Sequence, residues 1–172
     1  MVSYKLFTCY INSPIGYLHI RATEAAIESV WFADELPADY TAPAQTDLPD
    51  CMVTCCQQLK DYFARKITAF NLPLNPQGTP FQQRVWQYLL QIPAGSTRTY
   101  GHIAATQFTV KTTRAVGAAC GANPIGIIIP CHRVISASGS LTGYAGGLWR
   151  KKWLLNFENS FQPHNQQLEM GF

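Results

Sequence analysis

The sequence predicts two domains of different class: an α/β N-terminal half with a small antiparallel sheet, and a mainly α C-terminal half with a helix-turn-helix. Three observations predict this. Short β-rich runs open the chain, a proline-rich stretch and a new helix start divide it near residue 79, and two short amphipathic helices follow. A chain of 172 residues is long enough for two small domains. We expect them at residues 1–78 and 79–158, with a tail at 159–172.

The first elements are expected to be strands. Tyr4–Ile11 is rich in β-forming residues, and Tyr17–Arg21 resumes that pattern after the turn-forming sequence Ser13-Pro14-Ile15-Gly16. A third apolar run covers Ile27–Phe32. These three runs predict a small antiparallel sheet.

A helix is expected from about Leu48 to Lys66, because apolar side chains recur there at helical spacing. They are Met52, Cys55, Cys56, Leu59, Tyr62 and Phe63. The cysteines at 51, 55 and 56 also permit a metal site. No histidine with ligand spacing accompanies them, so packing in the core is the favoured interpretation.

The second half begins at a strong helix start. Residues 71–78 contain two prolines and a glycine and predict a linker. Thr79-Pro80-Phe81-Gln82 then has the capping-box pattern with proline at the first helical position. The apolar face continues through Val85, Leu89 and Ile92, and Pro93 ends the helix.

The next two helices form the expected helix-turn-helix. The first carries Tyr100, Ile103, Ala104 and Phe108, and Thr112-Thr113 can cap the second from Arg114 onward. The apolar stripe of the second helix is Val116, Ala119 and Cys120, and its opposite face is Arg114, Gly117, Ala118 and Gly121. Each glycine costs a helix about 1 kcal/mol, so this small face should approach another surface closely.

That surface has two interpretations. One is tight helix packing within the protein, but a lone buried Arg114 would be costly. The other is a nucleic-acid groove, with the arginine entering the base stack. Charge favours the second: residues 1–79 hold five Lys/Arg and eight Asp/Glu, a net −3, whereas residues 80–158 hold eight Lys/Arg and one acid, a net +7. Such a patch indicates a polyanion, although a basic surface without a partner remains the alternative.

The sequence argues against a membrane-spanning or a secreted protein. No apolar run reaches the 18 or so residues that span a bilayer, and the first residues lack the layout of a signal peptide. The six cysteines lack the spacing of small secreted domains. We therefore expect a reduced cytoplasmic protein without a membrane partner.

The segment Ile129–Val134 sets a thiol, Cys131, next to an imidazole, His132. A free thiol with a pKa of about 8.5 is only a few per cent thiolate at neutral pH, and the thiolate is the nucleophile. His132 and Arg133 are both at hand to lower that pKa. Pro130 favours extended backbone before it, which predicts a thiol at the end of a strand. A buried structural cysteine beside a surface histidine is the alternative.

These residues together resemble a known family. The matching motifs are Pro130–Val134, Arg114–Gly117, Asn123-Pro124, Gly143-Tyr144 and Gly146-Gly147. In order and spacing they resemble the O6-alkylguanine-DNA alkyltransferases, or methylated-DNA–protein-cysteine methyltransferases, over residues 79–158. The resemblance implies a ribonuclease-H-like N-terminal domain and a winged-helix-like C-terminal domain. The partner is double-stranded DNA with alkylated guanine, no cofactor or metal is needed, and a monomer is expected.

The resemblance also implies the chemistry. Cys131 attacks the alkyl carbon on guanine O6, with alkylated thymine O4 as a further substrate, and keeps the group as a thioether, so each molecule reacts once. His132 acts on Cys131 through a bridging water, and Glu158 orients the histidine. Glu158 is the one acid in residues 80–158, which favours a role over a solvated glutamate at a helix end.

A lesion inside the duplex must be flipped out. By resemblance, Arg114 fills the vacated stack, Tyr100 moves the 3′ phosphate and bonds the base, and Gly117, Ala118 and Gly121 line the DNA face. The substrate pocket is formed by Tyr100, Asn123, Val134, Tyr144 and Ala145. Some relatives carry serine at Ala145 and a second basic residue at Gly121. Without the other motifs, Tyr100 and Tyr144 would be ordinary half-buried core aromatics.

Two further functions are alternatives to the alkyltransferase. A damage sensor of the same fold would flip alkylguanine without repairing it, but such relatives replace the reactive cysteine that Cys131 provides. A Cys-His hydrolase would need an oxyanion hole and repeated turnover. It would leave the basic half and the small-faced helix unexplained.

Overall fold

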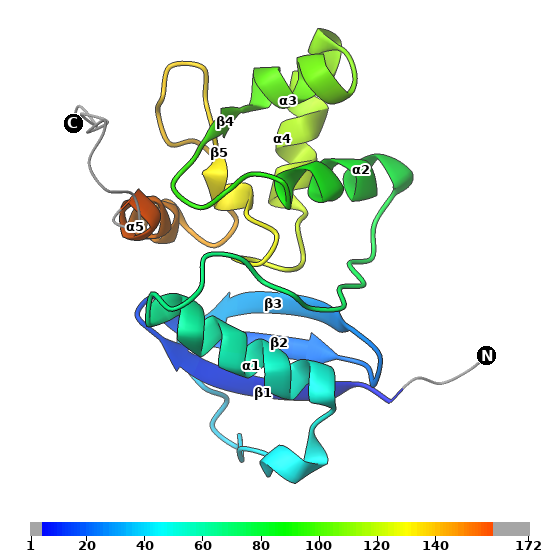
Figure 1. The fold of residues 1–172 in the computed structure, drawn as a ribbon, viewed down its shortest axis with the longest axis vertical. Coiled ribbons are helices and arrows are strands. Elements are labelled where there is room, and N and C mark those ends of the chain that lie inside the picture. The colour runs from blue at the N-terminus through cyan, green and yellow to red at the C-terminus, as the bar shows by residue number, and fades with distance from the viewer. Residues whose placement is uncertain (1–4, 160–172) are drawn as a thin grey trace. The chain divides into compact units, whose positions relative to one another are not determined.

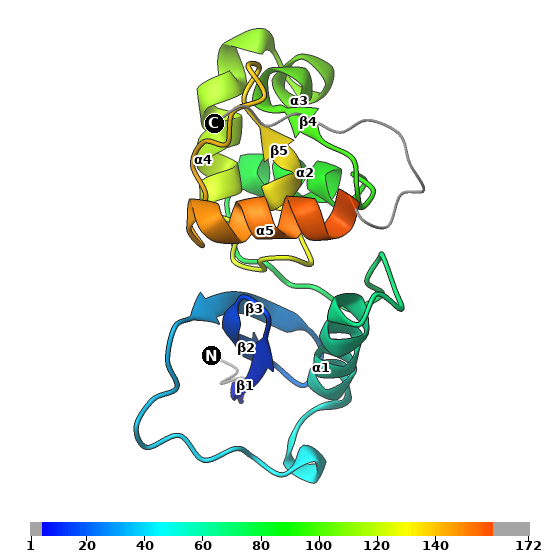
Figure 2. The ribbon, with the colours of Figure 1, turned by 90° about the vertical axis from the view of Figure 1, so that its left-hand side faces the viewer.

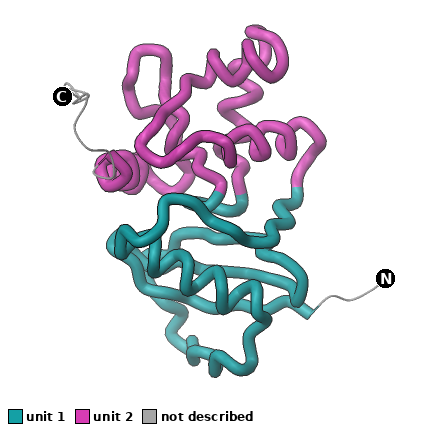
Figure 3. The backbone as a smooth tube through the Cα atoms, viewed as in Figure 1, with its two compact units in different colours: residues 1–77, 124–128 teal, residues 78–123, 129–172 magenta. Residues whose placement is uncertain are grey.

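The computed structural model describes residues 5–159, so the expected tail lies outside the described residues except for Asn159. The chain forms two compact units (Figure 3). The first holds residues 1–77 and 124–128, and the second holds residues 78–123 and 129–172. None of the helices in the described part has the length and apolar character needed to cross a bilayer.

The first unit contains the predicted three-stranded antiparallel sheet. Its strands are β1 (Phe7–Ser13), β2 (Gly16–Ala22) and β3 (Ile27–Ala33), in the order β1-β2-β3 (Figure 1). The β1–β2 turn closes at Gly16, whose φ of 100° favours glycine. Alternating side chains of β2, Leu18, Ile20 and Ala22, are buried together on one face.

Helix α1 (Asp50–Phe63) packs along that sheet (Figures 1 and 2). A short 3-10 turn, η1 (Gln45–Asp47), precedes it. The helix is shorter than predicted because Pro49 is extended at its start and Arg65 adopts a left-handed φ of 61° after its end. Met52, Cys55, Leu59 and Tyr62 are buried, whereas Cys56 and Phe63 are half-buried. Two of the three α1 cysteines, Cys51 and Cys55, are thus core residues.

The segment 124–128 joins the first unit through backbone hydrogen bonds to β3. The Val30 amide donates to the Pro124 carbonyl at 3.0 Å, and the Gly126 amide donates to the Val30 carbonyl at 2.8 Å. A Cβ on Gly126 would lie 3.2 Å from that carbonyl, so glycine suits this close backbone approach.

The second unit is mainly helical. It comprises α2 (Pro80–Leu89), β4 (Arg98–Thr99), α3 (Tyr100–Gln107), η2 (Val110–Thr112), α4 (Thr113–Gly121), η3 (Cys131–Arg133), β5 (Val134–Ile135) and α5 (Leu148–Asn159). The two short strands pair in parallel. The capping box of α2 is present: Thr79 Oγ1 accepts from the Gln82 amide, and Gln82 Oε1 accepts from the Thr79 amide. Helices α2 and α4 are joined by the buried Trp86, whose Nε1 donates to the Ala119 carbonyl at 2.8 Å.

Two local predictions were wrong. Residues 127–129 form no strand, because Ile127 has a left-handed φ of 70° and Cys131 instead opens the 3-10 turn η3. Burial of the three isoleucines outweighs their β propensity there. Helix α4 begins at Thr113 without a capping side chain from Thr112, whose hydroxyl donates to the Thr109 carbonyl instead.

Candidate active site

A fully buried carboxylate organises the centre of the second unit. Glu158, near the end of α5, accepts hydrogen bonds from two neighbouring residues of η3. His132 Nε2 lies 2.9 Å from Glu158 Oε1, and Arg133 binds both carboxylate oxygens, at 2.9 Å from Nε and 2.7 Å from Nη2. Arg133 Nη1 also donates to the Ile92 carbonyl. Charge-assisted hydrogen bonds therefore connect η3 to α5.

The charges of this cluster follow from its burial and its pairing. Burial alone would raise the pKa of Glu158, but the bonds from His132 and Arg133 outweigh it and hold that pKa far below its ordinary value. Burial lowers the pKa of His132, and the opposing pull of Glu158 does not reverse this. The cluster is thus an ionised Glu158–Arg133 pair beside a neutral histidine at pH 7.

The other ring nitrogen of His132 is left open. Since Nε2 faces Glu158, the second nitrogen of this neutral imidazole is Nδ1. Nδ1 is buried and has no hydrogen-bond partner among residues 5–159. With Nε2 donating its proton to the carboxylate, Nδ1 carries the free lone pair, which is the arrangement of a general base.

The thiol of Cys131 is fixed by Asn123, the buried residue that follows α4. Asn123 Nδ2 donates to the Ile129 carbonyl at 2.8 Å and to Cys131 Sγ at 3.2 Å. One amide therefore sets both the turn before the motif and the position of the sulfur.

A buried lysine supplies positive charge to this thiol. Burial raises the pKa of Cys131 above its ordinary value, while Asn123, the Lys151 ammonium and the backbone amides of Cys131 and His132 act in the opposite direction. Arg133 has no such part, since Glu158 and the Ile92 carbonyl engage its guanidinium. Of the two sequence neighbours that could lower the pKa of this thiol, Arg133 therefore has its charge paired elsewhere, with the Glu158 carboxylate.

Lys151 also ties three segments together. Its Nζ donates to the Val134 carbonyl at 2.6 Å and to the Thr142 carbonyl at 3.1 Å, and lies 3.5 Å from Tyr100 Oη. No sequence pattern indicates this role, because Lys151 stands in the run Arg150-Lys151-Lys152 and resembles any solvated basic residue. Only its complete burial identifies it.

A pocket of about 630 Å³ opens beside these residues. It brings together six predicted residues, Tyr100, Arg114, Gly117, Gly121, Tyr144 and Ala145, and adds Thr113, Thr142 and Gly143. Three of the residues predicted for the substrate pocket or the DNA face do not line it. Asn123 and Val134 are buried, and Ala118 is exposed on α4. Cys131 is only 5% exposed.

The small face of α4 is free of internal packing. A Cβ on Gly121 would meet nothing within 4 Å, and one on Gly117 would make only ordinary contact with the Tyr100 ring at 3.9 Å. Arg114 and Ala118 are exposed on the same face. Tight packing within the second unit therefore does not explain the glycines. An external surface that approaches α4 would explain them.

Comparisons with known proteins find the same family in both halves of the chain. A family model described as "6-O-methylguanine DNA methyltransferase, DNA binding domain" matches residues 80–160, and the "ribonuclease-like domain" of the same family matches residues 6–76. The methylated-DNA–protein-cysteine methyltransferase of Mycolicibacterium paratuberculosis is 40% identical over 163 residues, which cover 95% of this chain and 96% of that protein.

Solved structures give the same result. The crystal structure of the Mycobacterium tuberculosis O6-methylguanine methyltransferase has a TM-score of 0.77 and 42% identity, and it covers 94% of this chain and 97% of that chain. A structure of M. tuberculosis OGT in complex with DNA has a TM-score of 0.77 and 44% identity, with coverages of 89% and 93%.

Replacing Glu158 with glutamine should destabilise the protein most at neutral pH. The substitution leaves Arg133 buried without its counter-charge, which should lower the free energy of unfolding by about 3 kcal/mol or more at pH 7. Since the folded pKa of Glu158 lies below its ordinary value of 4.5, its stabilisation is present above about pH 4.5 and is lost as the pH falls.

Urea unfolding of wild type and Glu158→Gln between pH 7 and pH 3 measures this difference. The gap between the two proteins should stay constant from pH 7 to about pH 4.5 and should narrow from there toward pH 3. The exposed Glu24→Gln variant is the control and should change little at any pH. A constant gap across the range would contradict the assigned ionisation of Glu158.

Proposed function

The chain belongs to the 6-O-methylguanine DNA methyltransferase family, the methylated-DNA–protein-cysteine methyltransferases, and we propose that Cys131 is the cysteine that takes the alkyl group. One observation carries the assignment. Cys131 Sγ is held by Asn123 at 3.2 Å, next in sequence to a neutral histidine that Glu158 orients and whose Nδ1 is open. The other thiol of the second unit, Cys120, lies on the core stripe of α4.

Proton removal is proposed to run through His132. A water between Nδ1 and Sγ would give that buried nitrogen a partner and would carry the proton from sulfur to the imidazole. Glu158 stabilises the imidazolium that forms, in the way a carboxylate supports histidine in other catalytic sites. Burial keeps the thiol protonated in the free protein, and the Lys151 ammonium favours the thiolate once it forms.

The transfer itself is a displacement at carbon. The thiolate attacks the alkyl carbon, the new C–S bond forms as the C–O6 bond breaks, and the electron pair leaves with the guanine. Tyr100 suits contact with the departing base, because burial raises its pKa to about 12 and keeps the phenol protonated. The thioether has no leaving group for a return step, so one molecule repairs one lesion. O4-alkylthymine presents the same kind of alkyl–oxygen bond.

The DNA side of the proposal rests on α4. Its exposed face combines Arg114 with Gly117, Ala118 and Gly121, and it borders the pocket that Tyr144 and Ala145 close on the other side. A small face lets the helix approach a groove, and Arg114 can fill the space of a flipped nucleotide. Every proposed site residue belongs to the second unit of one chain, so a monomer suffices.

Incubation with a duplex that contains O6-methylguanine should add one methyl group per protein molecule, located on Cys131. Intact mass spectrometry measures the adduct, and fragmentation of the peptide 115–133 separates Cys131 from Cys120. Cys131→Ala should accept no methyl group, whereas the matched Cys120→Ala variant should accept one. Methyl transfer to Cys131→Ala would contradict the assignment of the nucleophile.

Replacing Arg114 with alanine should slow repair of duplex DNA by about tenfold or more, because flipping costs a few kcal/mol that the arginine offsets. Repair of the same lesion in single-stranded DNA, where no stack must be filled, should change far less. Single-turnover rates on the two substrates measure the difference. Equal slowing on both would assign Arg114 to general DNA affinity rather than flipping.

The size of residue 121 should control DNA affinity without affecting the fold. Gly121→Ala should bind duplex DNA like wild type, whereas Gly121→Leu should bind about tenfold more weakly, because the larger side chain holds α4 away from the groove. Neither Cβ meets protein atoms, so both variants should keep the wild-type Tm within a few degrees. Fluorescence anisotropy measures affinity. Wild-type affinity in Gly121→Leu would remove α4 from the interface.

A further inference from the structure

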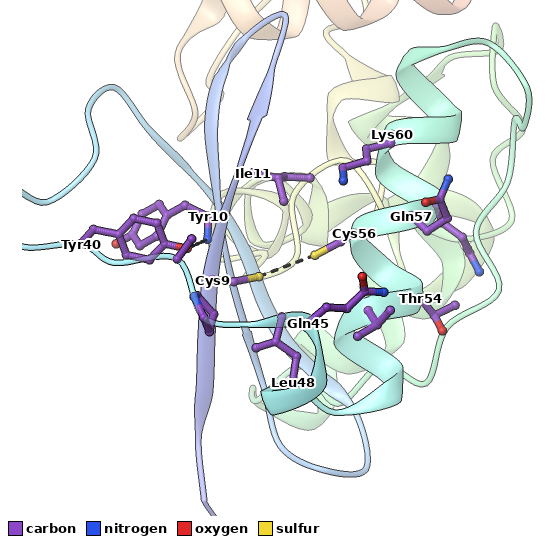
Figure 4. A pocket seen from close by; sticks show the side chains of 14 residues that line it. Cys9, Tyr10, Ile11, Tyr40, Gln45, Leu48, Thr54, Cys56, Gln57 and Lys60 are labelled. Atoms are coloured by element: carbon purple, nitrogen blue, oxygen red, sulfur yellow. Dashed lines mark hydrogen bonds between the residues drawn. The ribbon is translucent and has the colours of Figure 1, made fainter.

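The first unit holds a pair of neighbouring thiols that are remote in sequence from Cys131. Cys9 on β1 and Cys56 on α1 are 47 residues apart, yet their sulfur atoms lie 3.6 Å from each other (Figure 4). The two thiols form a hydrogen bond between the sheet and the helix that packs on it. The proposed repair reaction makes no use of this pair.

The surroundings of the two sulfur atoms are unequal. The hydrogen bond to Cys9 lowers the pKa of Cys56, against the effect of burial, and the ammonium of Lys60 one helical turn later lowers it further. The same hydrogen bond and burial raise the pKa of Cys9. Cys56 is therefore the sulfur that ionises, and Cys9 is the thiol that donates to it.

Cys56 is also reachable. Both cysteines line a pocket of about 510 Å³, together with Tyr10, Leu48 and Lys60 (Figure 4). Cys56 is half-buried, so a small molecule in the pocket can touch its sulfur. The neighbouring cysteines differ: Cys55 is completely buried, and Cys51 donates to the Thr23 carbonyl at 3.4 Å.

We propose that Cys9 and Cys56 are a peroxide-oxidisable dithiol, which closes to a disulfide between β1 and α1. The Cys56 thiolate attacks one oxygen of a hydroperoxide, and the O–O bond breaks. The sulfur becomes a sulfenic acid, and the alkoxide or hydroxide that leaves takes up a proton from solvent to give the alcohol or water. Cys9 then attacks that sulfur, its thiol proton and the hydroxyl group leave as water, and the S–S bond forms. The peroxide is reduced by two electrons and the two thiols are oxidised.

The required movement is small. A disulfide has an S–S length of about 2.05 Å, so the sulfur atoms must close by about 1.5 Å from their present 3.6 Å. Rotation of two short side chains on facing elements provides a shift of that size. The bond would cross-link the sheet to α1 and constrain the unfolded chain between residues 9 and 56.

Peptide mapping tests the link on the full chain. The protein is treated with hydrogen peroxide, free thiols are blocked with iodoacetamide, and trypsin is added without reductant. Peptide 6–21 contains only Cys9, and peptide 22–60 contains Cys56 together with Cys51 and Cys55. Wild type should yield these two peptides joined, at their summed mass less two hydrogens plus the carbamidomethyl groups on Cys51 and Cys55, and dithiothreitol should separate them.

Variants assign the sulfur atoms. Cys56→Ala should lower the yield of joined peptide at least tenfold, whereas the matched Cys51→Ala variant should keep it. An undiminished link in Cys56→Ala would overturn the assignment. Failure of wild type to form the link, at peroxide concentrations that oxidise Cys131, would overturn the proposal as a whole.

A second measurement needs no change at the pair itself. In a Cys131→Ala background, which removes oxidation of the repair thiol from the readout, peroxide should raise the Tm of the protein by about 5 °C or more, and dithiothreitol should reverse the rise. An unchanged or lower Tm after the link has formed would show a strained bond and would contradict a pre-aligned dithiol.

Discussion

The buried carboxylate of Glu158 is the interaction on which the second unit depends. A buried charge is tolerable only when it is fully paired, and Arg133 and His132 provide that pairing from one turn of 3-10 helix. Arg133 also donates to the Ile92 carbonyl, which follows α2. The Glu158–Arg133 pair therefore holds α5, η3 and the chain after α2 relative to one another. The same bonds that hold the fold also set the tautomer of the histidine.

The position and the charge of the Cys131 thiol depend on two other side chains, Asn123 and Lys151. Asn123 positions the sulfur and the preceding carbonyl, and Lys151 brings a positive charge to a site that burial would otherwise keep neutral. Lys151 simultaneously holds the Val134 and Thr142 carbonyls beside Tyr100. These oxygens compensate the buried charge of Lys151. The same side chain therefore holds the pocket wall and lowers the pKa of the Cys131 thiol.

The two units place their thiols in different environments. Cys131 is 5% exposed and is held by the Asn123 amide, next to a buried histidine that is bonded to Glu158. Cys56 is half-buried in an open pocket, with a partner sulfur 3.6 Å away and Lys60 close by. These different environments favour the two proposed roles, with Cys131 reacting with a carbon electrophile and Cys56 reacting with small oxidants.

The sequence by itself determined the elements that depend on local chemistry. The β-rich runs of the first strands, the Thr79 capping box and the small face of α4 are recognisable from neighbouring residues. The adjacent Cys131 and His132 are likewise visible in the sequence itself. Tertiary structure alone decided which cation serves the thiol. Arg133 adjoins Cys131 in sequence but is withdrawn by Glu158, whereas Lys151, indistinguishable from a solvated lysine, is buried beside the site. Likewise, burial replaced the expected strand before Cys131 by an irregular turn, because packing over long sequence distances outweighs the preferences of individual residues.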